Sequence, residues 1–330
     1  MLLLLLPFVP LVVICYCFRR CFCCCGKNDY TGRHVMITGG SSGIGLALAK
    51  LFVRRGANVT IVARNKEKLI AAKSELNECQ TKSEQGRLFQ AVYAVSVDLS
   101  QGVEAINAAV AQPISEIGQV DVLINNAGTA SCGRFLDVDE KDFLRQMEIN
   151  YLSSVYTTRS ILPSMMQRRQ GQVAFVSSMA GQVGLYGYSA YTPSKYALRG
   201  LAECVQMEVK PRNIKVSVVF PPDTDTPGFA NENIAKPEAT KRLSGSAGLF
   251  TSEQVAENIF TGLERNRYNI WVGLDGFFLS TLTCGMGPSK SFFESFPQVM
   301  LGGFLRFVAL CYVSMFNSTV YQCEREENRL

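Results

Sequence analysis

Seven short apolar segments alternate with stretches of helical character between about residues 31 and 273. Most of the segments are uninterrupted runs rich in β-branched residues, which is typical of parallel strands that are buried on both faces. Strands that alternate with helices predict a single α/β domain built on a doubly wound parallel sheet, which binds ligands at the carboxyl ends of its strands. The expected strands span residues 34–39, 58–64, 91–97, 120–125, 172–178, 215–220 and 269–273.

A glycine-rich turn, TGGSSGIG at 38–45, follows the first expected strand and opens a helix predicted over 43–55. Its glycines permit a tight turn, and the helix N-terminus offers free N–H groups to a pyrophosphate. A plain glycine turn is the alternative, but strand, turn and helix stand in the order that a dinucleotide-binding Rossmann domain requires. The residues expected to contact the dinucleotide here are Gly39, Ser41, Ser42, Gly43, Ile44 and Gly45.

The end of the second expected strand indicates which dinucleotide is bound. NAD-binding domains usually place an acid at this point, whereas this chain has Arg64 and, one turn further on, Lys68. Two cations favour the 2′-phosphate of NADP; a solvated basic helix start is the alternative, although cations there oppose the helix dipole. At the end of the third strand, Asp98, followed by Leu99, either contacts the adenine or caps the next helix.

A tyrosine and a lysine stand four residues apart in SAYTPSKYALRG (189–200), at the start of a helix predicted over 189–210. Positions i and i+4 share one face of an α-helix, so Tyr191 and Lys195 are expected to project side by side. Such a pair can serve chemistry or packing, and the spacing alone does not distinguish the two.

Five motifs together resemble the short-chain dehydrogenase/reductase family. They are TGGSSGIG, NNAG (125–128), INYL (149–152), VSSMAG (176–181) and YTPSK (191–195), in the family's order and spacing over about residues 31–270. The resemblance implies an NADPH-dependent oxidoreductase. The catalytic residues that it implies are Ser178, Tyr191, Lys195 and Asn150.

The resemblance implies a role for each residue. Tyr191 donates a proton to the ketone oxygen as hydride arrives from NADPH. Lys195 lowers the pKa of Tyr191 by its charge and holds the nicotinamide ribose, so both residues also belong to the cofactor site. Ser178 orients the substrate oxygen, and Asn150 holds a water that relays protons to Lys195. Asn126 stabilises the strands beside the cofactor; for both asparagines the alternative is a buried amide satisfied by backbone groups.

Two further stretches resemble one branch of the family. PPDTDTPGF (221–229) replaces the Pro-Gly that most members have after the sixth strand, and TLTCGMGP occupies 281–288. That branch reduces a long-chain amino-ketone of sphingolipid synthesis on the cytosolic face of the endoplasmic reticulum. The alternatives are a membrane-bound reductase of retinoid or steroid ketones and a non-catalytic membrane scaffold. Helices 139–168 and 189–210 pair in dimers of many relatives, which raises the prospect of a homo-oligomer.

Residues 31–273 are therefore expected to form the NADP-binding domain, with residues 221–250 as a lid over the substrate. Within the lid, our hypothesis is that Asp223 or Asp225 pairs with the ammonium group of the substrate. Capping of a turn or helix by these aspartates is the alternative.

The first 18 residues carry no charged side chain and are followed by Arg19 and Arg20. A membrane span needs roughly 17 to 25 apolar residues, so residues 1–18 are long enough for a transmembrane anchor. Charge after the run rather than before it favours a retained anchor over a cleaved signal peptide. The positive-inside rule then puts a Cys- and Arg-rich linker, 19–30, and the catalytic domain in the cytosol, at the endoplasmic reticulum membrane that the resemblance implies.

The C-terminal region, 274–330, is also expected to associate with the membrane. Its apolar stretch 299–316 contains Arg306, which would cost about 2.5 to 3.5 kcal/mol at the centre of a bilayer. A helix that lies in the interface lets Arg306 reach water and is favoured over a span. A re-entrant hairpin with residues 270–290 is a further alternative.

Several site classes are disfavoured. His34 is the only histidine, so histidine-based metal sites cannot be built and no metal is expected; its place at the start of a strand favours a structural role. Six of the 12 cysteines lie in the first 25 residues, unlike a secreted disulfide framework. They are juxtamembrane thiols open to acylation, or simply small apolar residues. The formal charge of +5 is scattered, so nucleic acid is not an expected partner.

Overall fold

The computed structural model describes Pro10 and residues 13–16, 27–80, 90–245, 248–289 and 292–327. Most of the expected anchor (1–18) and of the expected linker (19–30), with most of the N-terminal cysteines, therefore lies outside the described residues.

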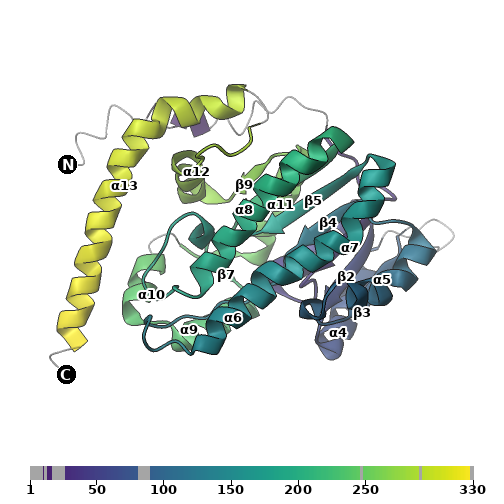
Figure 1. Cartoon of the computed structure of the whole chain (residues 1–330), viewed down its shortest axis with the longest axis horizontal. Helices are drawn as coiled ribbons and strands as arrows, with labels where there is room; N and C mark the ends of the chain where they lie inside the picture. Colours follow the sequence, from purple (N-terminus) through teal and green to yellow (C-terminus); the bar gives the residue numbers. More distant parts are fainter. Residues whose placement is uncertain are drawn as a thin grey trace.

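A parallel sheet of seven strands forms the centre of the domain (Figure 1). Its order is β3 (Val92–Ser96), β2 (Asn58–Ala63), β1 (His34–Thr38), β4 (Val122–Asn125), β5 (Gly171–Val176), β6 (Ile214–Phe220) and β9 (Asn269–Trp271). All seven strands agree with the sequence prediction to within two residues at each end, and the doubly wound architecture is confirmed. The order reverses between β1 and β4, so the sheet has its switch point beside the glycine-rich turn.

Helices cover both faces of the sheet because successive side chains of each buried strand point to opposite sides. Val35 and Ile37 of β1 belong to one core, whereas Met36 between them belongs to the other. The first core is closed by α3 (Gly43–Arg54), α4 (Lys66–Glu78) and α11 (Ser252–Glu264). The second is closed by α5 (Val103–Ile117), α7 (Ser153–Arg168) and α8 (Tyr191–Val209), of which α7 and α8 run across the front in Figure 1.

The segment expected to form a lid folds into small elements beyond β6. They are β7 (Thr224–Asp225), α9 (Pro227–Ala235), α10 (Glu238–Ser244) and β8 (Phe250–Thr251). Strands β7 and β8 pair in parallel as a separate two-stranded sheet. Thr226 caps α9 through a hydrogen bond from the backbone N–H of Phe229, so neither Asp223 nor Asp225 is the side chain that caps this helix.

A third apolar cluster joins the two ends of the chain. Cys15 is buried against α12 (Gly273–Leu282) and the first half of α13 (Phe292–Glu327). The Tyr16 ring lies 5.5 Å from the Trp271 ring and 5.4 Å from that of Phe277. Cys15 and Tyr16 of the expected N-terminal anchor therefore pack on the C-terminal region.

Helix α13 is a single element of 36 residues, twice the length of the apolar stretch in the sequence. It passes α12 and descends along the side of the domain to α10 (Figure 1). There Glu326 pairs with Arg242 of α10 at 2.9 Å, and Glu327 pairs with Arg134. Within the described part of the chain, residues 294–327 are the one helix long and apolar enough to cross a membrane, and an 18-residue window within it has a mean hydropathy of 1.8.

Candidate active site

The glycine-rich turn between β1 and α3 has a backbone that larger residues would not tolerate. Gly39 and Gly43 have φ angles of +65° and +52°. A Cβ atom on Gly45 would lie 2.4 Å from the carbonyl oxygen of Gly39, closer than any real contact. Helix α3 therefore starts directly against the turn, and the Ser42 side chain makes no capping bond within the described residues. This open helix N-terminus fits a pyrophosphate.

Thr38 and Asn126 lock the end of β1 to the end of β4. The Asn126 amide donates to the carbonyl oxygens of Thr38 and Gly39 at 3.0 and 3.4 Å. The Thr38 hydroxyl oxygen lies within hydrogen-bond distance of the backbone N–H groups of Asn126 and Ala127, at 2.9 and 3.0 Å. Asn126 thus holds the glycine-rich turn in place. The sequence analysis missed Thr38, although it is the first residue of TGGSSGIG.

The residues expected to select the nucleotide lie at the ends of β2 and β3. Arg64 directly follows β2, and Lys68 is in the first turn of α4, where its N–H is capped by Asn65 at 2.7 Å. Asp98 accepts from the backbone N–H and the hydroxyl of Ser100 at 3.0 and 2.8 Å, so its capping role is present. These bonds, and the nearby Arg64 charge, lower the pKa of Asp98. Leu99 is buried in the core.

A cavity of about 760 Å³ opens beside the glycine-rich turn, within the roughly 300–1,000 Å³ common for ligand pockets. It brings together most of the expected site residues: Gly39, Ser41, Ser42, Gly43, Ile44, Asn126, Ser178, Tyr191 and Lys195. Arg64, Lys68, Asp98 and Leu99 are not among its lining residues, and neither are Gly45 and Asn150, although both of the latter pack directly behind its wall.

Tyr191 and Lys195 project from the first turns of α8 into this cavity. The Lys195 ammonium lies 5.7 Å from the centre of the Tyr191 ring and donates to the Val176 carbonyl at 3.1 Å. Burial lowers the pKa of Lys195 to about 8. Against our expectation, the pKa of Tyr191 is raised, because burial outweighs every other influence and the hydrogen bond with Ser178 opposes it only in part. The phenol is therefore held in its protonated form.

The two neighbouring serines at the end of β5 differ in environment. Both serines line the cavity, and the Ser178 hydroxyl oxygen accepts from the Ala180 N–H at 3.1 Å. Ser177 is buried and donates to the Lys195 carbonyl at 2.8 Å, which fastens the start of α8 to the sheet. This geometry favours Ser178 over Ser177 as the residue that meets a ligand.

Asn150 lies within a π-helical turn, Met147–Leu152, and is completely buried. Its amide oxygen accepts from the Thr129 N–H at 2.8 Å, and its amide nitrogen lies 2.9 Å from the Ser194 hydroxyl. A Cβ atom on Gly128 would meet both the Asn150 oxygen and the Lys195 ammonium, at 3.0 and 3.2 Å. Protein groups thus satisfy the Asn150 amide, as the alternative interpretation expected, and the residue stands close to Lys195.

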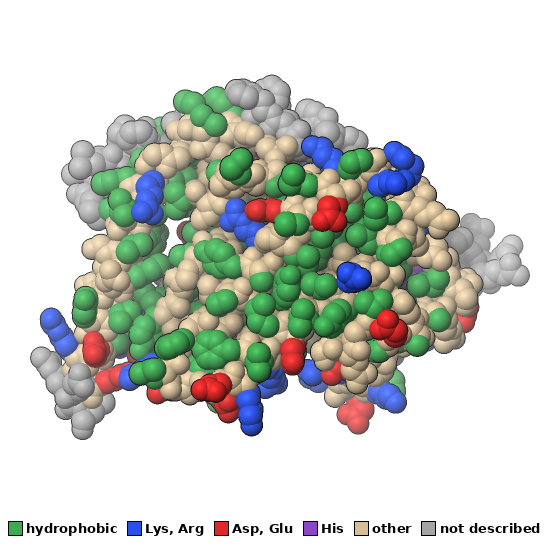
Figure 2. Space-filling view, viewed as in Figure 1, with side chains coloured by type: hydrophobic (Ala, Val, Ile, Leu, Met, Phe, Trp, Pro, Cys, Tyr) green, Lys and Arg blue, Asp and Glu red, His purple; other side chains and the backbone are tan. Residues whose placement is uncertain are grey.

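The far end of the cavity is mostly apolar and lies between α12, α13 and the lid, where Asp275 of α12 and Arg306 of α13 also line it. Its lining residues there include Phe278, Leu279, Leu282, Leu305, Val308, Ala309, Tyr312, Val313 and Phe316. Figure 2 shows further hydrophobic side chains along the outer side of α13. One continuous cavity thus connects the Tyr191 hydroxyl to an apolar channel beneath α13.

His34 has a structural environment. Its Nδ1 lies 2.7 Å from the Gly118 carbonyl and its Nε2 2.8 Å from the Thr60 hydroxyl, and burial lowers its pKa. Among the described residues there is no group of three or more His, Cys, Asp or Glu side chains arranged to hold a metal ion.

Comparison with known proteins gives consistent similarities. The chain is 46% identical over 299 residues to the 3-ketodihydrosphingosine reductase of Bos taurus, which covers 91% of this chain and 89% of that protein. It is 45% identical over 298 residues to the 3-dehydrosphinganine reductase of Danio rerio, which covers 90% and 88%. A short-chain dehydrogenase from Streptomyces avermitilis has a similar structure, with a TM-score of 0.62, 27% identity and coverage of 76% and 91%. Another, from Sphingobium yanoikuyae in complex with NADPH, has a TM-score of 0.60, 27% identity and coverage of 72% and 87%.

The profile of the short chain dehydrogenase family matches residues 33–237. This region contains the glycine-rich turn, six of the seven strands of the main sheet and the Tyr191–Lys195 pair. The chain therefore belongs to the short-chain dehydrogenase family.

Proposed function

We propose that this protein reduces 3-ketodihydrosphingosine to dihydrosphingosine with NADPH, in sphingolipid biosynthesis. Relatives that carry the names of this reductase align with about nine-tenths of the chain. The observation that carries the proposal is the shape of the cavity, which joins the Tyr191 hydroxyl to an apolar channel beneath α13. A substrate with a ketone near one end of a long alkyl chain matches both parts of the cavity: the ketone fits beside Tyr191 and the alkyl chain fits the apolar channel.

In this proposal Tyr191 is the general acid. When bound, NADPH supplies the hydride that reaches the ketone carbon. Tyr191 donates its proton to the ketone oxygen, and its raised pKa keeps the phenol protonated until then. Ser178 orients the oxygen from the cavity wall, and the Lys195 ammonium stabilises the phenolate that remains after the transfer. The relay water that the resemblance assigned to Asn150 stays a prediction, because protein groups already satisfy the Asn150 amide.

The cofactor in this proposal lies along the carboxyl ends of the strands. Gly39, Ser41, Ser42, Gly43, Ile44 and Gly45 form the turn that receives the pyrophosphate. Arg64 and Lys68, at the end of β2, pair with the 2′-phosphate that distinguishes NADP from NAD. Asp98, Leu99 and Asn126 complete the site on the neighbouring strand ends.

The same proposal assigns the enzyme to the surface of the endoplasmic reticulum membrane, with the domain in the cytosol. The substrate's alkyl chain resides in the bilayer and must be captured near its surface. Since α13 contacts the one domain at both of its ends, through α12 and through Arg242 and Arg134, a helix that lies along the membrane keeps these contacts and a span would break them.

The test is oxidation of NADPH by the full-length protein in detergent, with 3-ketodihydrosphingosine as substrate and NADH as the control cofactor. The proposal expects turnover with NADPH, formation of dihydrosphingosine and a much slower reaction with NADH. Turnover of retinoid or steroid ketones instead would overturn the substrate but keep the reductase. Binding of NADPH without turnover of any ketone would favour the non-catalytic scaffold.

We also propose self-association through the face that α6 (Glu140–Gln146) and α8 share. Leu144, Tyr196 and Met207 are exposed there, at 69%, 41% and 73%. Figure 2 shows hydrophobic side chains gathered over this front face. Light scattering of the detergent-solubilised protein should give the mass of a dimer, which Met207→Glu should reduce to that of a monomer. A monomeric wild-type protein contradicts the proposal.

A further inference from the structure

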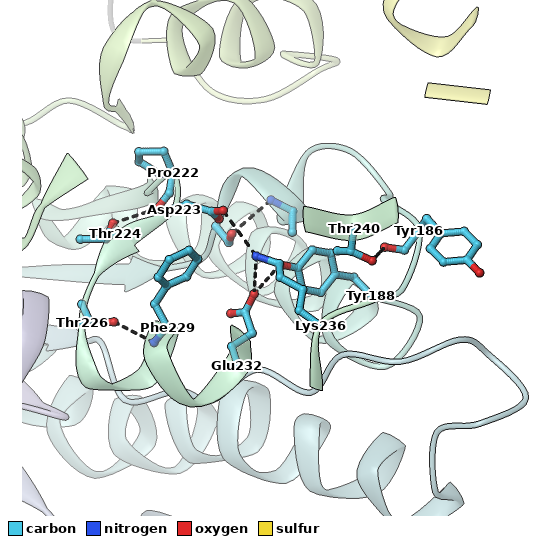
Figure 3. A network of polar contacts seen from close by, with 12 residues as sticks. Tyr186, Tyr188, Pro222, Asp223, Thr224, Thr226, Phe229, Glu232, Lys236 and Thr240 are labelled. Atoms are coloured by element: carbon cyan, nitrogen blue, oxygen red, sulfur yellow. Dashed lines mark hydrogen bonds and ion pairs between the residues drawn. The ribbon is translucent and has the colours of Figure 1, made fainter. Parts of the chain in front are cut away.

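A partly buried group of charged side chains lies at one wall of the cavity (Figure 3). The Lys236 ammonium lies 3.1 Å from Glu232 and 3.5 Å from Asp223, and the Tyr188 hydroxyl donates to Glu232. The Lys236 side chain is 1% exposed and that of Glu232 11% exposed, whereas that of Asp223 is 26% exposed. We call these four residues the acidic wall.

The acidic wall carries two carboxylates and one ammonium group, so its formal charge is minus one. Buried charges are costly unless they are paired, so an excess carboxylate at a ligand cavity calls for a cation. Glu232 and Asp223 both line the cavity, whereas Lys236 does not and lies behind them. The excess charge is therefore presented to the ligand.

Lys236 is fixed in its position behind the carboxylates. Its ammonium lies 4.8 Å from the centre of the Phe229 ring and 5.6 Å from that of Tyr188, both within cation–π distance. Both rings line the cavity together with Glu232 and Asp223, whereas Lys236 does not, so the two carboxylates meet the cavity and Lys236 stays on the protein side of the acidic wall.

The acidic wall stands next to the proposed general acid. The Tyr188 ring centre is 5.5 Å from that of Tyr191. Glu232 and Asp223 are also close enough to Tyr191 to act on it electrostatically. A cation bound at the acidic wall therefore lies close to a ketone whose oxygen meets Tyr191. The amino group of a 2-amino-ketone is such a cation, because it stands on the carbon next to the carbonyl.

Resting on the proposed function, we propose that Glu232 and Asp223 bind the ammonium group of the substrate and select a 2-amino-ketone over a plain ketone of equal length. The site assigns this role to Asp223 and not to Asp225, which is exposed on β7 and lies outside the cavity lining. Glu232 was not predicted from the sequence. An ammonium group offers three donors, and carboxylates are its strongest acceptors.

The test compares kcat/KM for the amino-ketone and for a ketone of the same chain length without the amino group. Glu232→Gln and Asp223→Asn keep the shape of each side chain and remove its charge. Each should lower kcat/KM for the amino-ketone by about 10- to 100-fold, as expected for the loss of one charge-assisted hydrogen bond, with a smaller loss for the plain ketone. Asp225→Asn, the same change two residues away, should leave both values unaltered.

Equal losses on both ketones, or no loss on either, would overturn the inference. The quenching of Trp271 fluorescence on addition of NADPH measures cofactor binding and so shows whether each variant is folded. If Glu232→Gln does not fold, Asp223→Asn still tests the inference, because it changes the more exposed carboxylate. A wild-type enzyme that reduces only ketones without an amino group would contradict the proposed function itself. A wild-type enzyme that reduces the amino-ketone, together with Glu232→Gln and Asp223→Asn variants that reduce it equally well, would contradict this inference alone.

Discussion

Tyr191 has a hydroxyl that is buried, protonated and in contact with the cavity. We predict that Tyr191→Phe lowers kcat by roughly 10²- to 10⁴-fold, the usual contribution of a general acid, while NADPH still binds. The matched control is Tyr196→Phe on the same helix, because Tyr196 is 41% exposed and lies outside the cavity lining. Initial rates of NADPH oxidation measure the difference. Comparable activity of the two variants would exclude Tyr191 as the acid.

Lys195 gives a prediction for stability as a function of pH. Burial lowers its pKa from 10.5 to about 8, so between these values the unfolded chain binds more protons than the folded one. The folded state therefore gains stability as the pH rises from about 8 towards 10.5. We predict that the free energy of unfolding of the wild type rises across this window relative to Lys195→Met, by up to about 3 kcal/mol at about 1.4 kcal/mol per pH unit.

The measurement is thermal unfolding of both proteins in the same detergent, without cofactor, from pH 7 to 10.5. Only the difference between the two proteins is informative, since other groups titrate in both. Parallel curves would mean that Lys195 keeps an ordinary pKa and is less buried than the structure has it.

At the scale of elements, α13 supplies one wall of the channel without belonging to the domain that binds the nucleotide. Ala309 lines the cavity, whereas its neighbour Leu310 is 50% exposed and does not. We predict that Ala309→Trp narrows the channel and lowers kcat/KM for a long-chain substrate by about tenfold, since overpacking costs roughly 1–3 kcal/mol. A short-chain amino-ketone should be much less affected.

Leu310→Trp, which adds a similar bulk on the other side of the helix, is the control and should leave the chain-length preference unchanged. If Ala309→Trp reduces the rates on long and short chains alike, the alkyl chain does not run beneath α13. Comparing Ala309→Trp with Leu310→Trp distinguishes a specific narrowing of the channel from a general disturbance of the helix.

At the scale of the whole molecule, the contacts at the two ends of α13 bear on whether this helix crosses the membrane or lies along it. Its first half packs on α12 together with Cys15, and its last turn pairs with Arg242. We predict that a C-terminal tag on the protein in sealed endoplasmic reticulum vesicles is digested by added protease as readily as the domain itself. Protection of the tag in intact vesicles, with digestion after detergent, would mean that α13 crosses the bilayer.

The sequence by itself determined the fold of the domain and predicted the glycine-rich turn and the Tyr191–Lys195 pair that the structure places at the cavity. Buried parallel strands are continuous apolar runs, and the turn at Gly39 needs glycine for its backbone angles, so both leave a local pattern. Tyr191 and Lys195 are four residues apart on one helix, and their proximity is also a local property.

Only the tertiary structure decided what surrounds that pair. Glu232 and Lys236 read as an ordinary surface pair at i and i+4, yet packing against Tyr188 and Phe229 buries them beside Tyr191. The apolar stretch of α13 reads as a membrane segment, and its place above the cavity depends on contacts with α12 and α10. Arg242 of α10 and Glu326 of α13, for example, are 84 positions apart, and such a pairing leaves no periodicity in a single sequence.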